Sequence, residues 1–231
     1  MDVIVRIERE DEHRKVEEMT RDSFWNLYMP GADEHFILNN LRKSPDFIQQ
    51  LCLVAVDKKT NQIVGNIVYT HSKIQDDNLI DHQMLTFGPL TVSKSCQRRG
   101  IGSLLIRTSI NKAKEMGYKA ICILGNHRYY SKFGFENGQK FGISSSDGSF
   151  PKCLLVKELF DGSLNEIKGR LFMSSSYEYD QTELAKFERE FKFKEKYITP
   201  SQKVFEKMVI LKYDDPDPDD IDLFSDNETR L

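Results

Sequence analysis

Two arginines and two glycines stand together at residues 97–102, in the run QRRGIG. An apolar segment with strand character precedes the run, and a segment with helical spacing follows it. The first N–H groups of a helix have no intrahelical partner and lie at the positive end of the helix dipole, so phosphate groups bind there. Glycine lets a pyrophosphate approach the backbone, and guanidinium groups bind phosphate oxygens in a fork geometry. The run predicts an anion site, although six residues alone fit a loop with solvated arginines equally well.

Two common phosphate-binding motifs do not fit this run. A P-loop requires GxxxxGK[ST], which the sequence does not contain. A dinucleotide-binding fingerprint requires GxGxxG after the first strand of a parallel unit, with an acid about twenty residues later. Here the order of elements is wrong for this fingerprint and most of the preceding strands have antiparallel character, so neither motif describes the run.

Length and composition restrict the class of protein. The 231 residues suit one large domain, or one domain with an extension, and the formal charge of −3 argues against a general nucleic-acid binder. The charged N-terminal residues and the absence of a long apolar run predict a cytoplasmic protein without a membrane segment. The four cysteines have no CxxC pairing, and the five histidines form neither HxxxH nor HExxH, so we expect reduced thiols, scattered surface histidines and no metal site.

Hydrophobic periodicity gives the order of elements that must position the run. We expect strands at 3–7, 51–56, 63–74, 84–92, 118–124 and 153–159, the last being the final core strand. We expect helices at 11–28, 33–43 and 101–116, with a short one inside 128–135. Gly117 suits a left-handed helix end. Pro89 lacks an N–H group, so Gly88-Pro89 predicts a bulge or break in the strand 84–92.

The chain divides into three predicted parts. Residues 1–160 form the core domain, residues 161–212 an extension packed on it, and residues 213–231 an acidic, disordered tail. Within the extension, residues 177–197 predict a docked helix. The side chains expected to pack there are Leu184, Phe187, Phe191 and Phe193.

Three motifs in this order resemble the GNAT superfamily of N-acetyltransferases. QRRGIG matches the family pattern Gln/Arg-x-x-Gly-x-Gly/Ala between the fourth strand and the next helix, FGPLTV resembles the family's bulged strand, and YYSKFGFE resembles its tyrosine-x-x-x-Gly-Phe element. Further stretches, among them PGADEHFILNNLRKSPDFI and FGISSSDGSFP, resemble a bacterial branch of acetyltransferases whose substrates are not known. The likeness covers roughly residues 3–210. It implies an α+β (α/β) fold: a mixed, mostly antiparallel central sheet with one splayed parallel strand pair and flanking helices.

The resemblance also implies a site and a reaction. Acetyl-CoA would lie between the splayed strands 84–92 and 118–124, and Tyr130, whose phenol has an ordinary pKa of about 10, would donate a proton to the leaving thiolate. Packing of both Tyr129 and Tyr130 as plain aromatics is the alternative. The residues expected to bind the cofactor are Leu90, Thr91, Val92, Gln97, Arg98, Arg99, Gly100, Ile101, Gly102, Ser103 and Asn126.

The general base is not identified by the sequence. Many family members carry a glutamate on the bulged strand, whereas QMLTFGPLTV has no carboxylate. Asp81, His82, Glu34 and His35 are candidates, each more often a surface group than a base, and a water chain to bulk solvent is an alternative route. A covalent route through Cys96 or Cys122 would need a lowered thiol pKa.

The predicted function is transfer of an acetyl group from acetyl-CoA to the primary amine of a small-molecule or peptide acceptor by direct attack. A non-catalytic acyl-CoA-binding module, and a protein-interaction module acting through residues 177–231, are the alternatives. Aromatic and polar residues expected to line the acceptor pocket, unless they are simply core, are Trp25, Tyr28, Glu34, His35 and Phe87.

Overall fold

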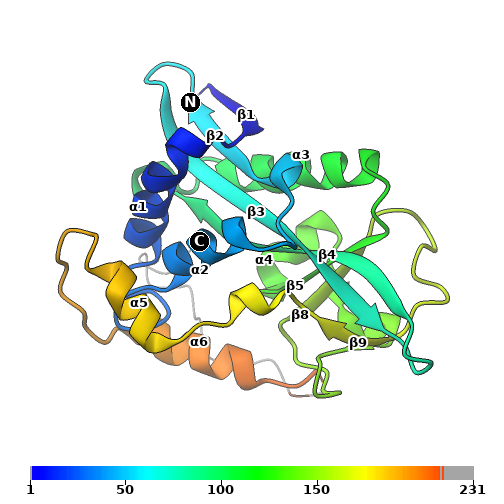
Figure 1. The fold of residues 1–231 in the computed structure, drawn as a ribbon. Coiled ribbons are helices and arrows are strands. Elements are labelled where there is room, and N and C mark those ends of the chain that lie inside the picture. Colours follow the sequence, from blue (N-terminus) through cyan, green and yellow to red (C-terminus); the bar gives the residue numbers. More distant parts are fainter. Residues whose placement is uncertain (1, 214, 216–231) are drawn as a thin grey trace.

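The computed structural model describes residues 2–213 and 215 (Figure 1). The strands are β1 Val3–Ile7, β2 Leu53–Asp57, β3 Gln62–Gln75, β4 Asp81–Val92, β5 Ala120–Leu124, β6 Glu136–Asn137, β7 Ile143–Ser144, β8 Leu154–Glu158 and β9 Gly169–Phe172. The α-helices are α1 His13–Phe24, α2 Glu34–Lys43, α3 Ile101–Glu115, α4 His127–Tyr130, α5 Gln181–Glu188 and α6 Pro200–Ile210.

The strands form one mixed sheet in the order β1-β2-β3-β4-β5-β8-β6, and β9 pairs with β3 and β7. All neighbours along the main path are antiparallel except β4 and β5. These two strands are parallel and share a single register pair, Leu85 with Ile121, after which they separate. The predicted mixed sheet with one splayed parallel pair is therefore confirmed.

The strand β4 carries the predicted irregularity at Gly88-Pro89. Ile67 of β3 pairs with Leu90, whereas Tyr69 pairs with Phe87, so two residues of β4 oppose one residue of β3. Such a bulge bends a strand and interrupts its ladder. It lies on the part of β4 that has already parted from β5.

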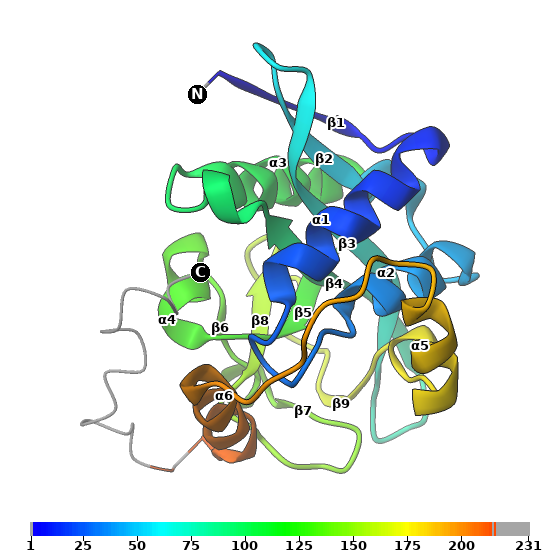
Figure 2. The same ribbon diagram turned by 90° about the vertical axis from the view of Figure 1, so that its left-hand side faces the viewer.

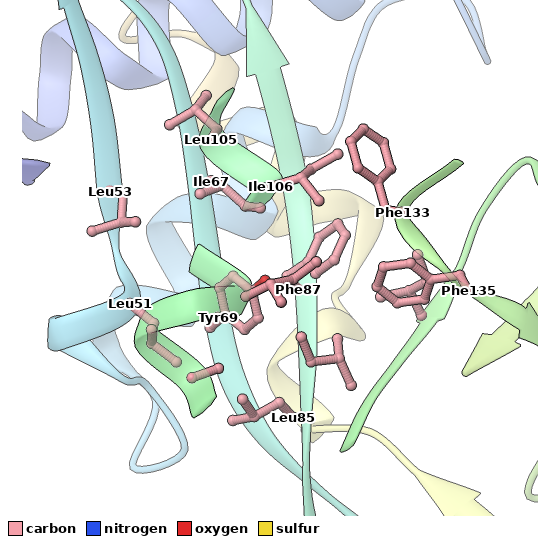
Figure 3. Packing of buried hydrophobic residues seen from close by; sticks show 14 of the residues in the cluster. Leu51, Leu53, Ile67, Tyr69, Leu85, Phe87, Leu105, Ile106, Phe133 and Phe135 are labelled. Atoms are coloured by element: carbon pink, nitrogen blue, oxygen red, sulfur yellow. The ribbon is translucent and has the colours of Figure 1, made fainter. Parts of the chain in front are cut away.

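Two helix layers cover the sheet (Figure 2). Along the inner strands, successive side chains point alternately to the two helix layers, as the two-residue period of a strand requires. Leu53 and Ile67 belong to the cluster that contains Leu105 of α3, whereas Val54 and Val68 belong to the cluster that contains α1 and α2. Figure 3 shows the first cluster, in which Tyr69 and Phe87 lie beside the α3 residues Leu105 and Ile106, with Phe133 and Phe135 coming from the segment after β5.

A buried ionic network joins the α1–α2 layer to the sheet. The guanidinium of Arg42 lies 2.5 Å from a carboxylate oxygen of Glu8 and 2.9 Å from one of Glu17, and all three side chains are at most 4% exposed. The thiol of Cys52 on the strand side donates to Glu8 at 2.8 Å. These bonds fix the position of α2 relative to β1 and β2.

Several predicted boundaries are wrong in the second half of the chain. The strand 153–159 is not the final one, since β9 follows and pairs with β3. The predicted helix 177–197 is an α-helix only over α5, after which residues 189–199 form an irregular connection to α6, a helix that was not predicted (Figure 2). Phe193 is 87% exposed and does not pack as expected. The first helix ends at Phe24 rather than at residue 28.

The C-terminal part lies against α1 and α2. Glu188 of α5 binds Arg21 of α1, and its Oε2 is 3.0 Å from Nε2 of His35, although neither ring nitrogen of His35 forms a hydrogen bond of regular geometry. His35 is fully buried, so the expectation of surface histidines is wrong here. The predicted acidic tail falls outside the described residues apart from 213 and 215. No described helix is both long and apolar enough to cross a membrane.

Candidate active site

The run QRRGIG forms the exposed turn between β4 and the first turn of α3. Gly100 is the residue before the helix and has φ 81°, a left-handed conformation that glycine adopts without strain. Arg98 has φ 61° and is exposed together with Arg99. The leading N–H groups of α3, from Ile101 to Ser103, lack intrahelical partners by geometry. Positive charge and unpaired donors therefore meet at one accessible point, as an anion site requires.

Two residues of the run are engaged by the protein itself. The side-chain amide of Gln97 donates to the carbonyl of Val92 at 3.2 Å and ties the turn to the end of β4. A Cβ atom on Gly102 would lie 2.8 Å from the hydroxyl of Tyr129, which also hydrogen-bonds to Ser103. The sequence did not single out Tyr129 as a site residue, because only the fold brings α4 to the start of α3.

The residues expected to meet the pantetheine arm lie on an open strand edge. Leu90, Thr91 and Val92 pair with β3 on one side. The pairing of β4 with β5 ends at Leu85, so the other edge of β4 has no strand partner beyond that point among the described residues. The side chain of Thr91 is buried, and its hydroxyl oxygen lies 3.2 Å from that of Thr20 on α1. Its backbone belongs to the open edge.

Tyr130 lies at the base of this opening. Its partly buried ring is 5.8 Å from Phe87 and 5.0 Å from Tyr129, measured between ring centroids. Burial raises the pKa of the Tyr130 hydroxyl above its ordinary value, and the nearby phenols Tyr129, Tyr28 and Tyr69 raise it further. The phenol is therefore protonated at neutral pH and is a hydrogen-bond donor.

The bulge of β4 offers space beside these aromatics. A Cβ atom on Gly88 would meet no other atom within 4 Å, so the backbone is accessible at this point. The carbonyl of Gly88 accepts a hydrogen bond of 3.3 Å from the hydroxyl of Tyr177. Tyr177 comes from the C-terminal part of the chain, which thus reaches the centre of the sheet.

Asn126 and the two candidate cysteines have structural partners. The side-chain oxygen of Asn126 accepts from the N–H of Arg128 and caps α4, which leaves its amide nitrogen for a ligand. Cys96 and Cys122 are buried, and burial raises the pKa of the Cys122 thiol to about 12. A thiol with such a pKa is not a nucleophile at neutral pH, so a covalent route through Cys122 is disfavoured.

Of the candidate bases, Glu34 lies close enough to Tyr28 to affect its pKa, whereas His35 is fully buried against Phe187 and Phe191 of the C-terminal part. Asp81 and His82 lie at the far end of β4, where they bind Lys73 and Asp76. Glu34, at the start of α2, is partly buried. Burial, followed by the neighbouring Asp33 carboxylate, raises the pKa of Glu34 well above its ordinary value. Its charge in turn raises the pKa of Tyr28, which is already raised by burial.

Comparisons with known proteins agree with this geometry. A family model described as acetyltransferase (GNAT) domain matches residues 49–137, which include β4, the QRRGIG turn, α3 and Tyr130. The uncharacterized N-acetyltransferase YhbS of Escherichia coli strain K12 is 25% identical over 167 residues, which cover 72% of this chain and 93% of YhbS. The uncharacterized N-acetyltransferase YjhQ of the same strain is 34% identical over 73 residues, which cover 32% of this chain and 40% of YjhQ.

Two solved structures share the fold. A crystal structure of E. coli YhbS in complex with CoA has a TM-score of 0.66 at 22% identity and covers 76% of this chain and 91% of that one. A GNAT family acetyltransferase from Brucella melitensis in complex with acetyl-CoA has a TM-score of 0.62 at 20% identity and covers 77% and 99%. Residues 49–137 of the chain therefore match an acetyltransferase (GNAT) domain, as the three sequence motifs predict, and the fold is that of the two solved GNAT structures.

Proposed function

We propose that the protein transfers the acetyl group of acetyl-CoA to the primary amine of an acceptor by direct attack. The observation that carries this proposal is the continuity of three features: the exposed Arg98-Arg99 turn at the start of α3, the open edge of β4, and the protonated phenol of Tyr130. Together they suit a long ligand with a diphosphate at one end and a reactive thioester at the other.

The solved relatives support the choice of co-substrate. The structures from E. coli and Brucella melitensis contain CoA and acetyl-CoA, respectively, within the same fold. In this chain, the N–H groups of residues 101–103 and the guanidinium groups of Arg98 and Arg99 would bind the diphosphate. The backbone of Leu90, Thr91 and Val92 would bind the pantetheine amides as a neighbouring strand does. Asn126 would use its free amide nitrogen.

The proposed reaction needs alignment and two proton transfers. The amine nitrogen forms a bond with the thioester carbon and loses a proton to a base or to water, the carbon–sulfur bond breaks, and the thiolate takes a proton from Tyr130, which regains one from solvent. Positioning of the two reactants contributes much of the rate in such a transfer. The accessible backbone at Gly88 offers a place for the thioester beside Tyr130, and a hydrogen-bond donor there would stabilise the developing negative charge on oxygen.

The experiment that tests this function measures binding and turnover separately. Calorimetric titration of the purified full chain with acetyl-CoA should give binding, and mass spectrometry with a panel of primary amines should show acetylated product and free CoA. Binding without turnover of any amine would support the non-catalytic acyl-CoA module instead. Absence of binding would overturn both functions.

A further inference from the structure

A helix that lies outside the matched family domain spans the acceptor side of the proposed site. At its start, the side chains of Ser201 and Gln202 donate to the carbonyls of Leu27 and Asn26, at 2.7 and 3.1 Å. Phe205 of α6 stacks on Tyr28 with ring centroids 4.3 Å apart. The helix is thus fixed to the loop between α1 and α2 through both backbone and aromatic contacts.

The other end of α6 is fixed to the opposite side of the opening. The N–H of Lys152 donates to the carbonyl of Leu211 at 2.8 Å, and the N–H of Tyr213 donates to the carbonyl of Phe150 at 2.9 Å. Residues 150–152 lead into β8, the neighbour of β5. The α1–α2 loop follows the end of α1, where the hydroxyl of Ser23 donates to the carbonyl of Val92 on β4. Because β4 and β5 part between these two anchors, α6 bridges the two sides of the gap.

The opening therefore has two different ends. The start of α3, with Arg98 and Arg99, is exposed and cationic. The end beneath α6 is bounded by aromatic rings, those of Tyr28 and Phe205, and Tyr28 is close enough to Tyr130 to raise the pKa of that phenol. If the diphosphate takes the first end, the acceptor must take the second.

A carboxyl group stands at the second end. Glu34 opens α2 directly after the loop that carries Tyr28, and its Oε2 accepts the N–H of Asp33 at 3.3 Å. The titratable groups that interact with it are Asp33, Tyr28 and Tyr179. A carboxylate among aromatic rings suits a cationic amine, since rings attract cations over their faces and the carboxylate pairs with them.

We propose that the acceptor is a small primary amine on a compact apolar or aromatic skeleton, enclosed beneath α6 by Tyr28, Phe205 and Glu34, and that Glu34 takes its proton. This inference rests on the proposed function. The ammonium gives one proton to the Glu34 carboxylate, and the freed lone pair attacks the thioester. As the carbon–sulfur bond breaks, Tyr130 protonates the leaving thiolate, the second proton leaves the nitrogen and restores the Tyr130 phenol, and the proton on Glu34 returns to solvent. A lysine on a folded protein could reach the thioester only through an open surface on the acceptor side, and α6 covers that side.

Charge and burial suit Glu34 to this task. An effective general base has a pKa near the working pH, and the pKa of Glu34 is raised in that direction by burial and by Asp33. The base then lies on α2 instead of the bulged strand, which contains no carboxylate between Gln83 and Val92.

The test uses 2-phenylethylamine and a lysine-containing decapeptide as probes with the full chain. We expect acetylation of 2-phenylethylamine and a much lower rate with the peptide. Glu34→Gln should lower kcat/KM by about a hundredfold and remove the acidic limb of its pH profile, and Glu34→Asp should restore part of the rate. Phe205→Ala should lower the ratio of kcat/KM for 2-phenylethylamine to kcat/KM for the peptide by about tenfold. Val209→Ala, on the exposed side of α6, should leave this ratio unchanged.

The outcomes separate the two proposals. Calorimetry should give wild-type acetyl-CoA affinity for the Glu34 and Phe205 variants, which shows that they fold and bind. If acetyl-CoA binds but the peptide is the better acceptor, or if Glu34→Gln keeps the wild-type pH profile, the inference is wrong and the proposed function stands. If acetyl-CoA does not bind to the wild-type chain, both are wrong.

Discussion

The hydroxyl oxygen of Tyr129 lies 2.8 Å from the position that a Cβ atom of Gly102 would occupy, and it hydrogen-bonds to the side chain of Ser103. Real Cβ atoms do not approach a neighbour so closely. The missing side chain at Gly102 is therefore what allows α4 to reach the first turn of α3. Gly102, which the sequence motif associates with a pyrophosphate, thus also packs against Tyr129 of the same chain.

Gly102→Ala should displace Tyr129 and weaken CoA binding by about five- to tenfold, because the hydroxyl loses its hydrogen bond beside the proposed diphosphate site. Calorimetry with CoA measures this loss. The double variant Gly102→Ala/Tyr129→Phe removes the clashing oxygen, so it should melt at a higher temperature than Gly102→Ala alone. Equal melting temperatures would contradict the proposed clash.

Arg98 combines an exposed charge with a left-handed backbone. Its φ of 61° costs roughly 1 kcal/mol in a residue with a side chain, whereas glycine adopts it freely. Arg98→Gly should therefore keep or raise the melting temperature while CoA affinity falls about tenfold at low salt. The loss should shrink as salt increases, because exposed charges are screened. Arg98→Lys keeps the charge and serves as the control, and a salt-independent loss would argue against a direct phosphate contact.

The first half of the fold follows from periodicity and breaker residues. The strand Val3–Ile7 has the predicted bounds, the helix α3 ends before Gly117, and the bulge lies at Gly88-Pro89 where proline removes a ladder donor. These signals are local, so the sequence carries them without tertiary context. The division at residues 160 and 212 remains a prediction.

The C-terminal helices are less predictable because their apolar positions are sparse. Helix α6 begins with Pro200 in its first turn, a start signal, but Val209 and Ile210 are exposed and blur its apolar face. The contact between Tyr28 and Phe205 joins segments far apart in the chain, and no local pattern predicts it. For the same reason the sequence could not rank Glu34 above Asp81 or His82.

Arg42 should be the most sensitive charged position for stability. Arg42→Leu leaves the buried carboxylates of Glu8 and Glu17 without their cation, which should lower the free energy of unfolding by about 3–5 kcal/mol. Lys140→Leu, which breaks an exposed ion pair with Glu136, should change it by less than about 1 kcal/mol. Urea unfolding measures both, and similar values for the two variants would contradict the importance of the network.

Acid should release α5 from α1. Burial alone would raise the pKa of Glu188, but the His35 ring nitrogen 3.0 Å from its Oε2 and the hydrogen-bonded guanidinium of Arg21 outweigh burial and lower that pKa to about 2, from 4.5. A lowered pKa in the docked state means that docking is stabilised above pH 4.5 and loses this contribution as the pH falls from 4.5 towards 2.

The single tryptophan reports this change, because the indole N–H of Trp25 donates to the carbonyl of Glu195 at 2.9 Å in the segment after α5. Trp25 fluorescence should shift over that pH range in the wild type. In Glu188→Gln the shift between pH 4.5 and 2 should be much smaller, and an identical titration would exclude Glu188 as its source.

Tyr130 should affect turnover more than binding. The proposed role of its phenol is to protonate the leaving thiolate, a step that contributes only once the carbon–sulfur bond begins to break. Tyr130→Phe keeps the ring that packs against Phe87 and removes only the donor. We expect kcat to fall by about a hundredfold while the dissociation constant for acetyl-CoA changes less than about twofold.

The raised pKa of Tyr130 also fixes the expected pH dependence. A phenol whose pKa lies above its ordinary value of 10 stays protonated through pH 8–10, so the wild-type rate should not fall in that range through loss of this proton. Tyr118→Phe is the matched control. The Tyr118 hydroxyl lies 2.8 Å from Nε2 of His71, and this pair is not part of the opening. Tyr130 donates the proton only if Tyr130→Phe is slow and the control is not. Equal rates would mean that water protonates the thiolate and that Tyr130 serves only as a packing aromatic.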